Sequence, residues 1–263
     1  MNFIDMRTVV LEQACITLIS ALVAGLLFWH NRRRYKGIGL WMGAFLLQST
    51  GIALLLLRGQ IPDAVSIVFA NVLNMSGFIL LYAGFCRFWA RPFSNRLNLA
   101  FFAVFVGIHG YFTFADPSLP IRSLNINFWI AVFFARCGWA VYSGAPEQLR
   151  PAARFPALAA AGFALVALAR MGVILSGNAC TDFFQSCPED TFLFFLFQLL
   201  SALFTFGLFL MVNRRLLADT RADFEGRVEA QKALGGALKI ARLGTWTWGV
   251  KSGRMNLSEE MRI

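Results

Sequence analysis

The sequence has 263 residues, of which 58% are hydrophobic and only 14% are charged. Soluble domains are about half apolar and about one quarter charged, so this composition excludes an ordinary globular protein and requires lipid around much of the surface. The formal net charge of +10 does not indicate binding to nucleic acid, because most Lys and Arg residues stand at the ends of apolar runs or near the C-terminus.

Seven apolar stretches follow one another along the chain, and each is close to the roughly 20 residues that cross a hydrocarbon core. They cover residues 8–30, 38–57, 65–89, 98–115, 124–143, 156–176 and 191–213. The first stretch is as long as a span, and its basic cluster follows it, so we expect a retained helix rather than a cleaved signal peptide. The sequence therefore predicts an all-α membrane protein with a seven-helix transmembrane bundle over residues 1–213.

Lys and Arg residues are divided unequally between the two sets of connections. One side has Arg32, Arg33, Arg34, Lys36, Arg87, Arg91, Arg96, Arg150, Arg154, Arg214 and Arg215, and the other has only Arg7, Arg58 and Arg122. Because basic connections stay in the cytoplasm, this bias predicts an N-terminus outside the cell membrane and a C-terminus in the cytoplasm.

Polar side chains from five of the expected helices fall at similar depths in the half that we expect to face outwards. They are Glu12, Gln13, Asn71, Asn74, His109, Arg170 and Gln198. Ionisable groups within spans are costly to bury and usually pair or bind a ligand, and the natural pair is Glu12 with Arg170. Two interpretations stay open: a ligand pocket that opens to the periplasm, or an interhelical polar clamp of about 0.6 kcal/mol per contact without a ligand.

Two further features of the spans bear on chemistry. Arg136 lies deep in the fifth span at the level of Gln48, and we expect its side chain to snorkel towards the cytoplasmic headgroups. The only histidines, His30 and His109, lie on different helices at opposite faces, so we expect no metal site, no haem and no other cofactor.

Cys180 and Cys187 bracket the last outer connection, and an oxidising periplasm would favour a disulfide between them. The weaker alternative is zinc binding, because only two thiols stand beside the carboxylates of Asp182, Glu189 and Asp190.

After Asn213 the sequence changes to charged residues and good helix formers, so the last span is expected to continue as a cytoplasmic helical linker over residues 214–240. A rough heptad seam runs through Leu217, Phe224, Val228, Leu234 and Leu238. It predicts either a parallel homodimer through this helix or a monomeric amphipathic helix on the membrane surface.

Residues 241–263 resemble the opening of a PAS domain. An A-R-L-G segment at 241–244 precedes the pattern G-x-W-x-W with Trp246 and Trp248, a turn with Ser252 and Gly253, and an L-S-E-E helix start at 257–260. Alternating β-formers, a Gly-containing turn and Ser258 as a helix cap agree with this pattern. The stretch covers about the first quarter of such a domain, so we expect it neither to close the sheet nor to form the pocket of that family.

The seven-span region resembles the membrane sensor modules of bacterial diguanylate cyclases and sensor histidine kinases. The resemblance rests on N-R-R-R-Y at 31–35, G-L-W at 39–41 and R-G-Q-I-P-D at 58–63. It implies a bacterial inner-membrane sensory input module that passes a small-molecule or lipid cue through the seventh helix to a PAS domain and effector. The G-G-D-E-F loop and phosphoacceptor-His helix of those effectors are absent, so we do not expect the chain itself to be an enzyme.

Two other functions stay open, a small transporter or channel and a truncated product without output activity. A retinal protein is excluded, because residues 191–213 contain no Lys that could form the Schiff base.

Overall fold

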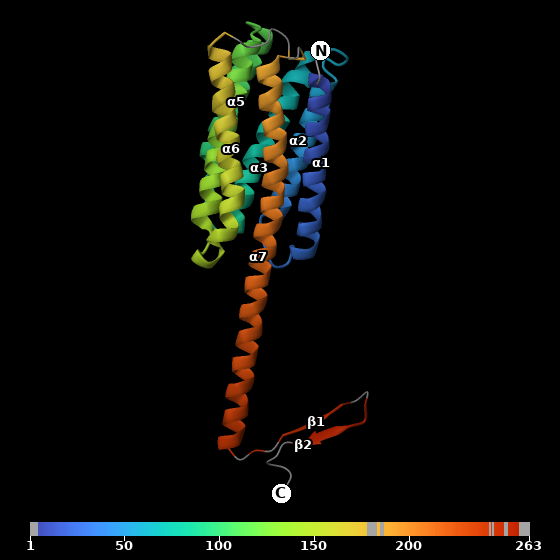
Figure 1. Cartoon of the computed structure of the whole chain (residues 1–263), viewed down its shortest axis with the longest axis vertical. Helices are drawn as coiled ribbons and strands as arrows, with labels where there is room; N and C mark the ends of the chain where they lie inside the picture. Colours follow the sequence, from blue (N-terminus) through green and yellow to red (C-terminus); the bar gives the residue numbers. More distant parts are fainter. Residues whose placement is uncertain are drawn as a thin grey trace. The chain divides into compact units, whose positions relative to one another are not determined.

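The computed structural model describes residues 5–177, 183–184, 187–241, 243, 245–249 and 252–257. Contacts within the chain divide it into two compact units, Met1–Val212 and Asn213–Ile263. The first unit is a bundle of helices, and the second contains the remainder of the last helix and a small hairpin (Figure 1).

Seven helices in the described residues are long and apolar enough to cross a membrane, which confirms the predicted all-α, multi-pass bundle. They are α1 (Met6–Asn31), α2 (Ile38–Leu56), the π-helix η1 (Ala64–Phe69) with α3 (Ala70–Phe88), α4 (Asn95–Phe114), α5 (Leu119–Gly144), the 3-10 turn η2 (Glu147–Leu149) with α6 (Arg150–Leu175), and α7 (Pro188–Ile240).

The largest differences from the predicted starts are in α5, which begins at Leu119 rather than at residue 124, and in α6, which begins at Arg150 rather than at residue 156. Each has a proline within its first two positions, Pro120 in α5 and Pro151 in α6. Proline fits the first turn of a helix, where its missing N–H has no intrahelical acceptor. These prolines therefore start helices, although both lie between the predicted apolar stretches.

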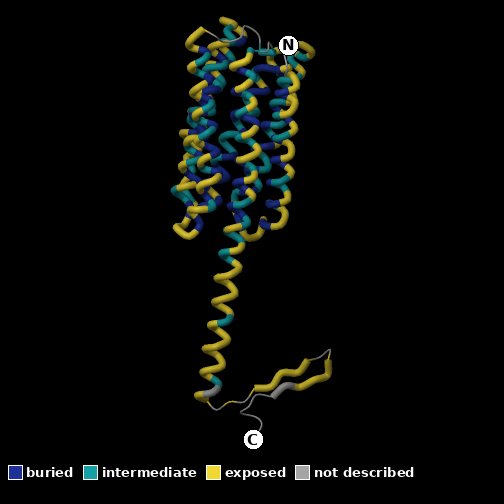
Figure 2. Tube along the Cα trace, in the orientation of Figure 1, coloured by how far each residue is buried: buried dark blue, intermediate teal, exposed yellow. Residues whose placement is uncertain are grey.

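Many large apolar side chains of the bundle are exposed, which is the arrangement expected of helices in lipid. Leu22 of α1, Trp139 of α5 and Leu158 of α6 are 62%, 70% and 70% exposed. Buried residues occupy the inward faces of the same helices (Figure 2).

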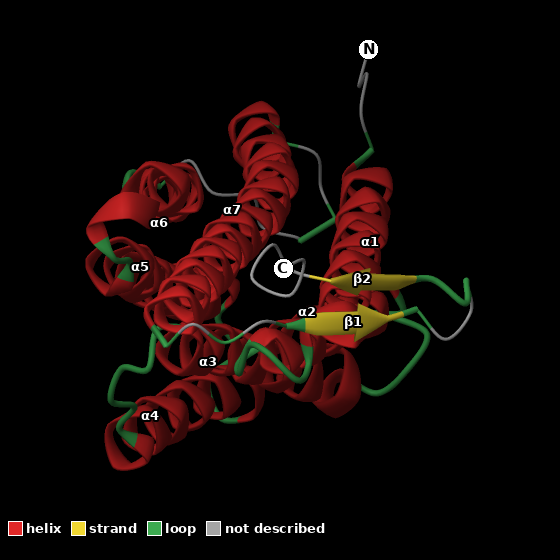
Figure 3. Cartoon of the chain, turned by 90° about the horizontal axis from the view of Figure 1, so that it is seen from below, coloured by secondary structure: helices red, strands yellow, loops and turns green. Residues whose placement is uncertain are grey.

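Within the bundle, α2 packs between α1 and α3, and α5 packs on α6, while α4 contacts α3 and α5 at the edge (Figure 3). Glycines allow α2 and α3 to approach closely. A Cβ atom on Gly84 would lie 2.4 Å from the Trp41 ring, and one on Gly77 would lie 2.7 Å from the Gln48 side chain. Small residues at helix contacts are the usual route to tight packing in lipid.

In the second unit, α7 continues as a helix to Ile240, in agreement with the predicted helical continuation of the last span. Strand β1 (Trp246–Trp248) pairs antiparallel with β2 (Met255–Leu257), and Trp246 stands opposite Leu257. The hairpin lies where alternating residues and a glycine turn predict two strands. The helix start expected at Ser258 lies outside the described residues.

Candidate functional site

A cavity of about 170 Å³ lies inside the bundle, between residues of α1, α2, α3, α5, α6 and α7. Its wall is mostly apolar and includes eight phenylalanines: Phe45, Phe78, Phe134, Phe163, Phe183, Phe194, Phe197 and Phe204. Its polar lining residues are Gln13, Thr17, Ser20, Gln48, Asn71, Asn74, Arg170 and Ser201.

Four of the seven predicted site residues line this cavity, namely Gln13, Asn71, Asn74 and Arg170. Residues of α1, α3 and α6 that were predicted to lie at the same depth therefore do lie together in the wall of the cavity. The other predicted residues are placed differently: His109 and Gln198 are buried in helix contacts, and Glu12 is exposed.

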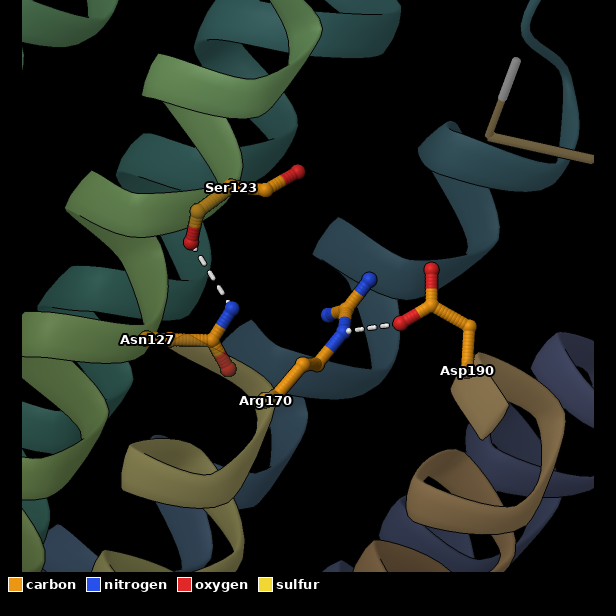
Figure 4. A network of polar contacts seen from close by, with 4 residues as sticks. All are labelled: Ser123, Asn127, Arg170 and Asp190. Atoms are coloured by element: carbon orange, nitrogen blue, oxygen red, sulfur yellow. Dashed lines mark hydrogen bonds and ion pairs between the residues drawn. The ribbon is translucent and has the colours of Figure 1, made fainter. Parts of the chain in front are cut away.

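Arg170 is buried and forms an ion pair with Asp190 in the first turn of α7 (Figure 4). The Nε atom of Arg170 donates to Oδ1 of Asp190 at 3.1 Å. On another side, the guanidinium carbon lies 4.2 Å from the ring centroid of Phe194, a cation–π contact. The arginine thus joins α6 to α7 by charge and by ring stacking, and we call its contact with Asp190 the α6–α7 latch.

The predicted pair of Glu12 with Arg170 is wrong. Glu12 is exposed on α1, whereas the guanidinium is buried against α7. Hydropathy places the start of the last span at residue 191, which leaves Asp190 in the connection. The helix begins at Pro188 instead, and this additional turn places the carboxylate beside Arg170.

A row of polar contacts joins α1 to α7, and two of its members, Gln13 and Gln198, were predicted. Gln198 donates to the backbone carbonyl of Val9, and the Gln13 amide donates to the Ser201 hydroxyl at 3.1 Å. A third contact joins the hydroxyls of Ser20 and Thr205 at 2.7 Å. Sequence reasoning missed Ser201 and Thr205, although they follow Gln198 at helical spacing on one face of α7.

Asn71 connects the π-helix to α4. Its amide nitrogen donates to the carbonyl of Ile67 at 2.7 Å and lies 3.2 Å from Nε2 of His109. The imidazole stacks on Phe105, with ring centroids 5.3 Å apart. The π-helical turn η1 therefore lies next to Asn71, a residue of the cavity wall. In other proteins such turns are frequently found at functional sites.

Two amides of the cavity wall have atoms without hydrogen-bond partners among the described residues. These atoms are Nε2 of Gln48, a buried side chain, and Oε1 of Gln13. Because buried polar atoms in proteins are nearly always paired, these two unpartnered atoms lower the stability of the fold around the cavity.

Arg136 reaches towards Asn98 in the first turn of α4, and its expected snorkelling to the cytoplasmic headgroups stays a prediction. It donates to the side-chain oxygen of Asn98 at 2.8 Å, and its guanidinium carbon lies 4.2 Å from the ring centroid of Tyr82. These partners on α3 and α4 hold the cation between helices. Gln48, the neighbour expected from its level, lines the cavity instead.

Cys180 and Asp182 lie outside the described residues, so the disulfide with Cys187 and the alternative zinc site stay predictions.

Asn127 of α5 is a buried residue that was not among the predicted site residues. Its side-chain amide donates a hydrogen bond to the backbone carbonyl of Ser123, one turn earlier in the same helix, at 2.7 Å (Figure 4).

The wall of the cavity suits binding rather than acid–base chemistry. Among its described lining residues there is no Asp, Glu, His or Cys, and Arg170 is the one charged side chain. A comparison with protein-family models, with curated proteins and with solved structures found no match for this chain.

Proposed function

We propose that this chain is the membrane sensory input module of a bacterial signal-transduction receptor. In this proposal, a cue that occupies the cavity changes the position of α7, and the segment over residues 214–240 passes the change to an effector. The observation that carries it is that α7 contributes Phe194, Phe197, Ser201 and Phe204 to the cavity wall and continues as one helix to Ile240.

The contacts that hold α7 within the bundle suit a helix with two positions. Polar contacts between membrane helices are worth on average about 0.6 kcal/mol each, so the α1–α7 row can exchange partners at small cost. A ligand shifts such an equilibrium only if it binds one position more tightly than the other. The wall of the cavity is shared between α7 and five other helices, so a ligand there contacts both of the parts whose relative position would change.

The proposed orientation places the N-terminus in the periplasm and the C-terminus in the cytoplasm of a bacterial inner membrane. It is supported by the concentration of Lys and Arg in and beside the connections after α1, α3 and α5, and in α7 directly after Asn213. In this orientation the latch and the predicted polar residues lie in the outer half, and the 214–240 segment lies inside.

The partner that we propose for the 214–240 segment is a second copy of the chain. Leu217, Phe224 and Leu234 of the predicted seam are exposed in the single chain, at 58%, 67% and 61%. Their spacing is close to a heptad repeat, which buries such residues in a parallel coiled coil.

We propose that the hairpin of β1 and β2 is the opening of a PAS domain. The support for this is the residue pattern around Trp246 and Trp248, which lie in β1.

A helix-phase experiment tests the proposed function. A reporter kinase is joined in helical continuity to Ile240, and one to seven residues are inserted after Thr220, with output and the amount of protein in the membrane measured for each insertion. Because each residue turns a helix by about 100°, output should vary with the insertion length, and seven residues should restore the original value. Output that is independent of insertion length, at equal amounts of membrane protein, would contradict the proposal.

A further inference from the structure

The cavity combines an aromatic interior with a single cationic group. Arg170 is the one charged residue of its described lining, and the opposite charge is supplied from outside the lining by Asp190. Only the Nε–Oδ1 contact joins the two side chains at hydrogen-bond distance, although a guanidinium has five N–H donors in a planar fork. Such a fork matches the geometry of a planar carboxylate, with which it can form two parallel hydrogen bonds.

The size of the cavity limits the remainder of the ligand. An apolar cavity of about 150 Å³ in another protein accommodates benzene, so about 170 Å³ suits one ring or a chain of several carbons. Phe134 and Phe163, which stack with centroids 4.1 Å apart, offer apolar ring surface to such a group.

We propose that the cavity binds a small aromatic or short-chain carboxylate, whose carboxylate takes the place of Asp190 as the partner of Arg170. The inference rests on the proposed function and specifies the class of cue. The exchange is balanced in charge, because Arg170 keeps one anionic partner. Asp190, the third residue of α7, is then released from the latch close to the N-terminal end of that helix, where its carboxylate can be hydrated.

This exchange connects the ligand to α7. While the latch is closed, the first turn of α7 is tied to α6, and when a ligand carboxylate replaces Asp190 that tie is lost. The ligand therefore binds the unlatched position of α7 more tightly than the latched one, which is the differential affinity that a conformational switch requires.

The test uses the full chain in lipid nanodiscs and 4-fluorobenzoate as the probe, with binding measured from its ¹⁹F NMR signal. Two variants change opposite sides of the latch. Arg170→Gln removes the cation and should weaken binding by about tenfold or more. Asp190→Asn removes the competing anion and should strengthen binding by about threefold or more, because less of the protein is held in the latched state.

The neutral probe 4-fluorobenzamide is the matched control, and its affinity should differ by less than about twofold among the three proteins. Thermal unfolding of each variant checks that it is folded. A purely structural latch would make both variants bind worse, and that result would overturn the inference. So would the absence of 4-fluorobenzoate binding by both the wild-type chain and Asp190→Asn.

The experiment separates this inference from the proposed function. Failure of carboxylate binding, together with output that follows helix phase in the kinase fusion, overturns the ligand class and leaves the sensory role. Binding with the predicted opposite effects, together with output that ignores helix phase, supports the ligand site and overturns the sensory role.

Discussion

Arg170 and Asp190 form the residue-scale contact on which the site depends. Both side chains are buried, so each charge relies on the other for the solvation that water would otherwise supply. The carboxylate also stands in the first turn of α7, where the helix dipole favours negative charge.

The latch predicts strong coupling between two substitutions. Arg170→Gln and Asp190→Asn should each lower stability, because each leaves a buried charge without its partner. The double variant should lose less than the sum of the two, with a coupling free energy of about 1–3 kcal/mol. Thermal unfolding in detergent of the four proteins measures this coupling, and additive losses would argue against the ion pair.

Gln48 allows a second residue-scale prediction. Its Nε2 is buried without a partner among the described residues, and such a donor costs about 1–3 kcal/mol. Gln48→Met keeps the length of the side chain and removes the donor, so the unliganded protein should be stabilised by about 1 kcal/mol.

The matched control is Gln198→Met, which loses the hydrogen bond to the carbonyl of Val9 and should destabilise. If both substitutions lower the unfolding temperature equally, the Gln48 amide is satisfied in the membrane and the prediction fails.

At the scale of elements, hydropathy located all seven spans but not the ends that matter for the site. The sequence could predict depth along a helix, and this brought Gln13, Asn71, Asn74 and Arg170 to one cavity. It could not predict which way each residue faces, because every side of these helices is apolar. Neighbouring residues of α1 illustrate this limit, since Gln13 lines the cavity while Glu12 is exposed.

The partner of Arg170 was missed for a related reason. Charged residues before an apolar run are normally assigned to a connection. The first turn of a helix can nevertheless consist of polar residues, because it need not lie in the hydrocarbon core. Asp190 therefore belongs to α7 and not to the connection. The π-helical turn η1 was likewise invisible to the sequence pattern, because residues 64–69 have the same apolar character as α3.

The contact of α2 with α3 predicts unequal effects of two equivalent substitutions. Gly84→Ala places a Cβ atom 2.4 Å from the Trp41 ring, so the helices must separate, at a cost of about 1–3 kcal/mol. Gly107→Ala in α4 meets no atom within 4 Å and should be neutral or stabilising by up to about 1 kcal/mol, because alanine is the better helix former. Thermal unfolding of the two variants compares them directly, and equal effects would contradict the close approach of α2 to α3.

In the whole molecule, α7 brings three features together: it lines the aromatic cavity, it carries Asp190 of the latch in its first turn, and it continues as a helix from Pro188 to Ile240. A coupling free energy of about 1–3 kcal/mol between two sites corresponds to a change of about 5- to 150-fold in an equilibrium. In the proposed sensory role, a latch of this strength would be sufficient to switch an output domain, provided that the helix after Asn213 stays intact.

The most direct test of this account is the output of the kinase fusion with and without the latch. Asp190→Asn should change basal output by about fivefold or more at an equal amount of protein in the membrane. A second substitution, Glu229→Pro, should abolish that difference because proline breaks the transmitting helix, whereas Glu229→Gln should preserve it. The account would be contradicted if Asp190→Asn left output unchanged, or if its effect persisted through the proline.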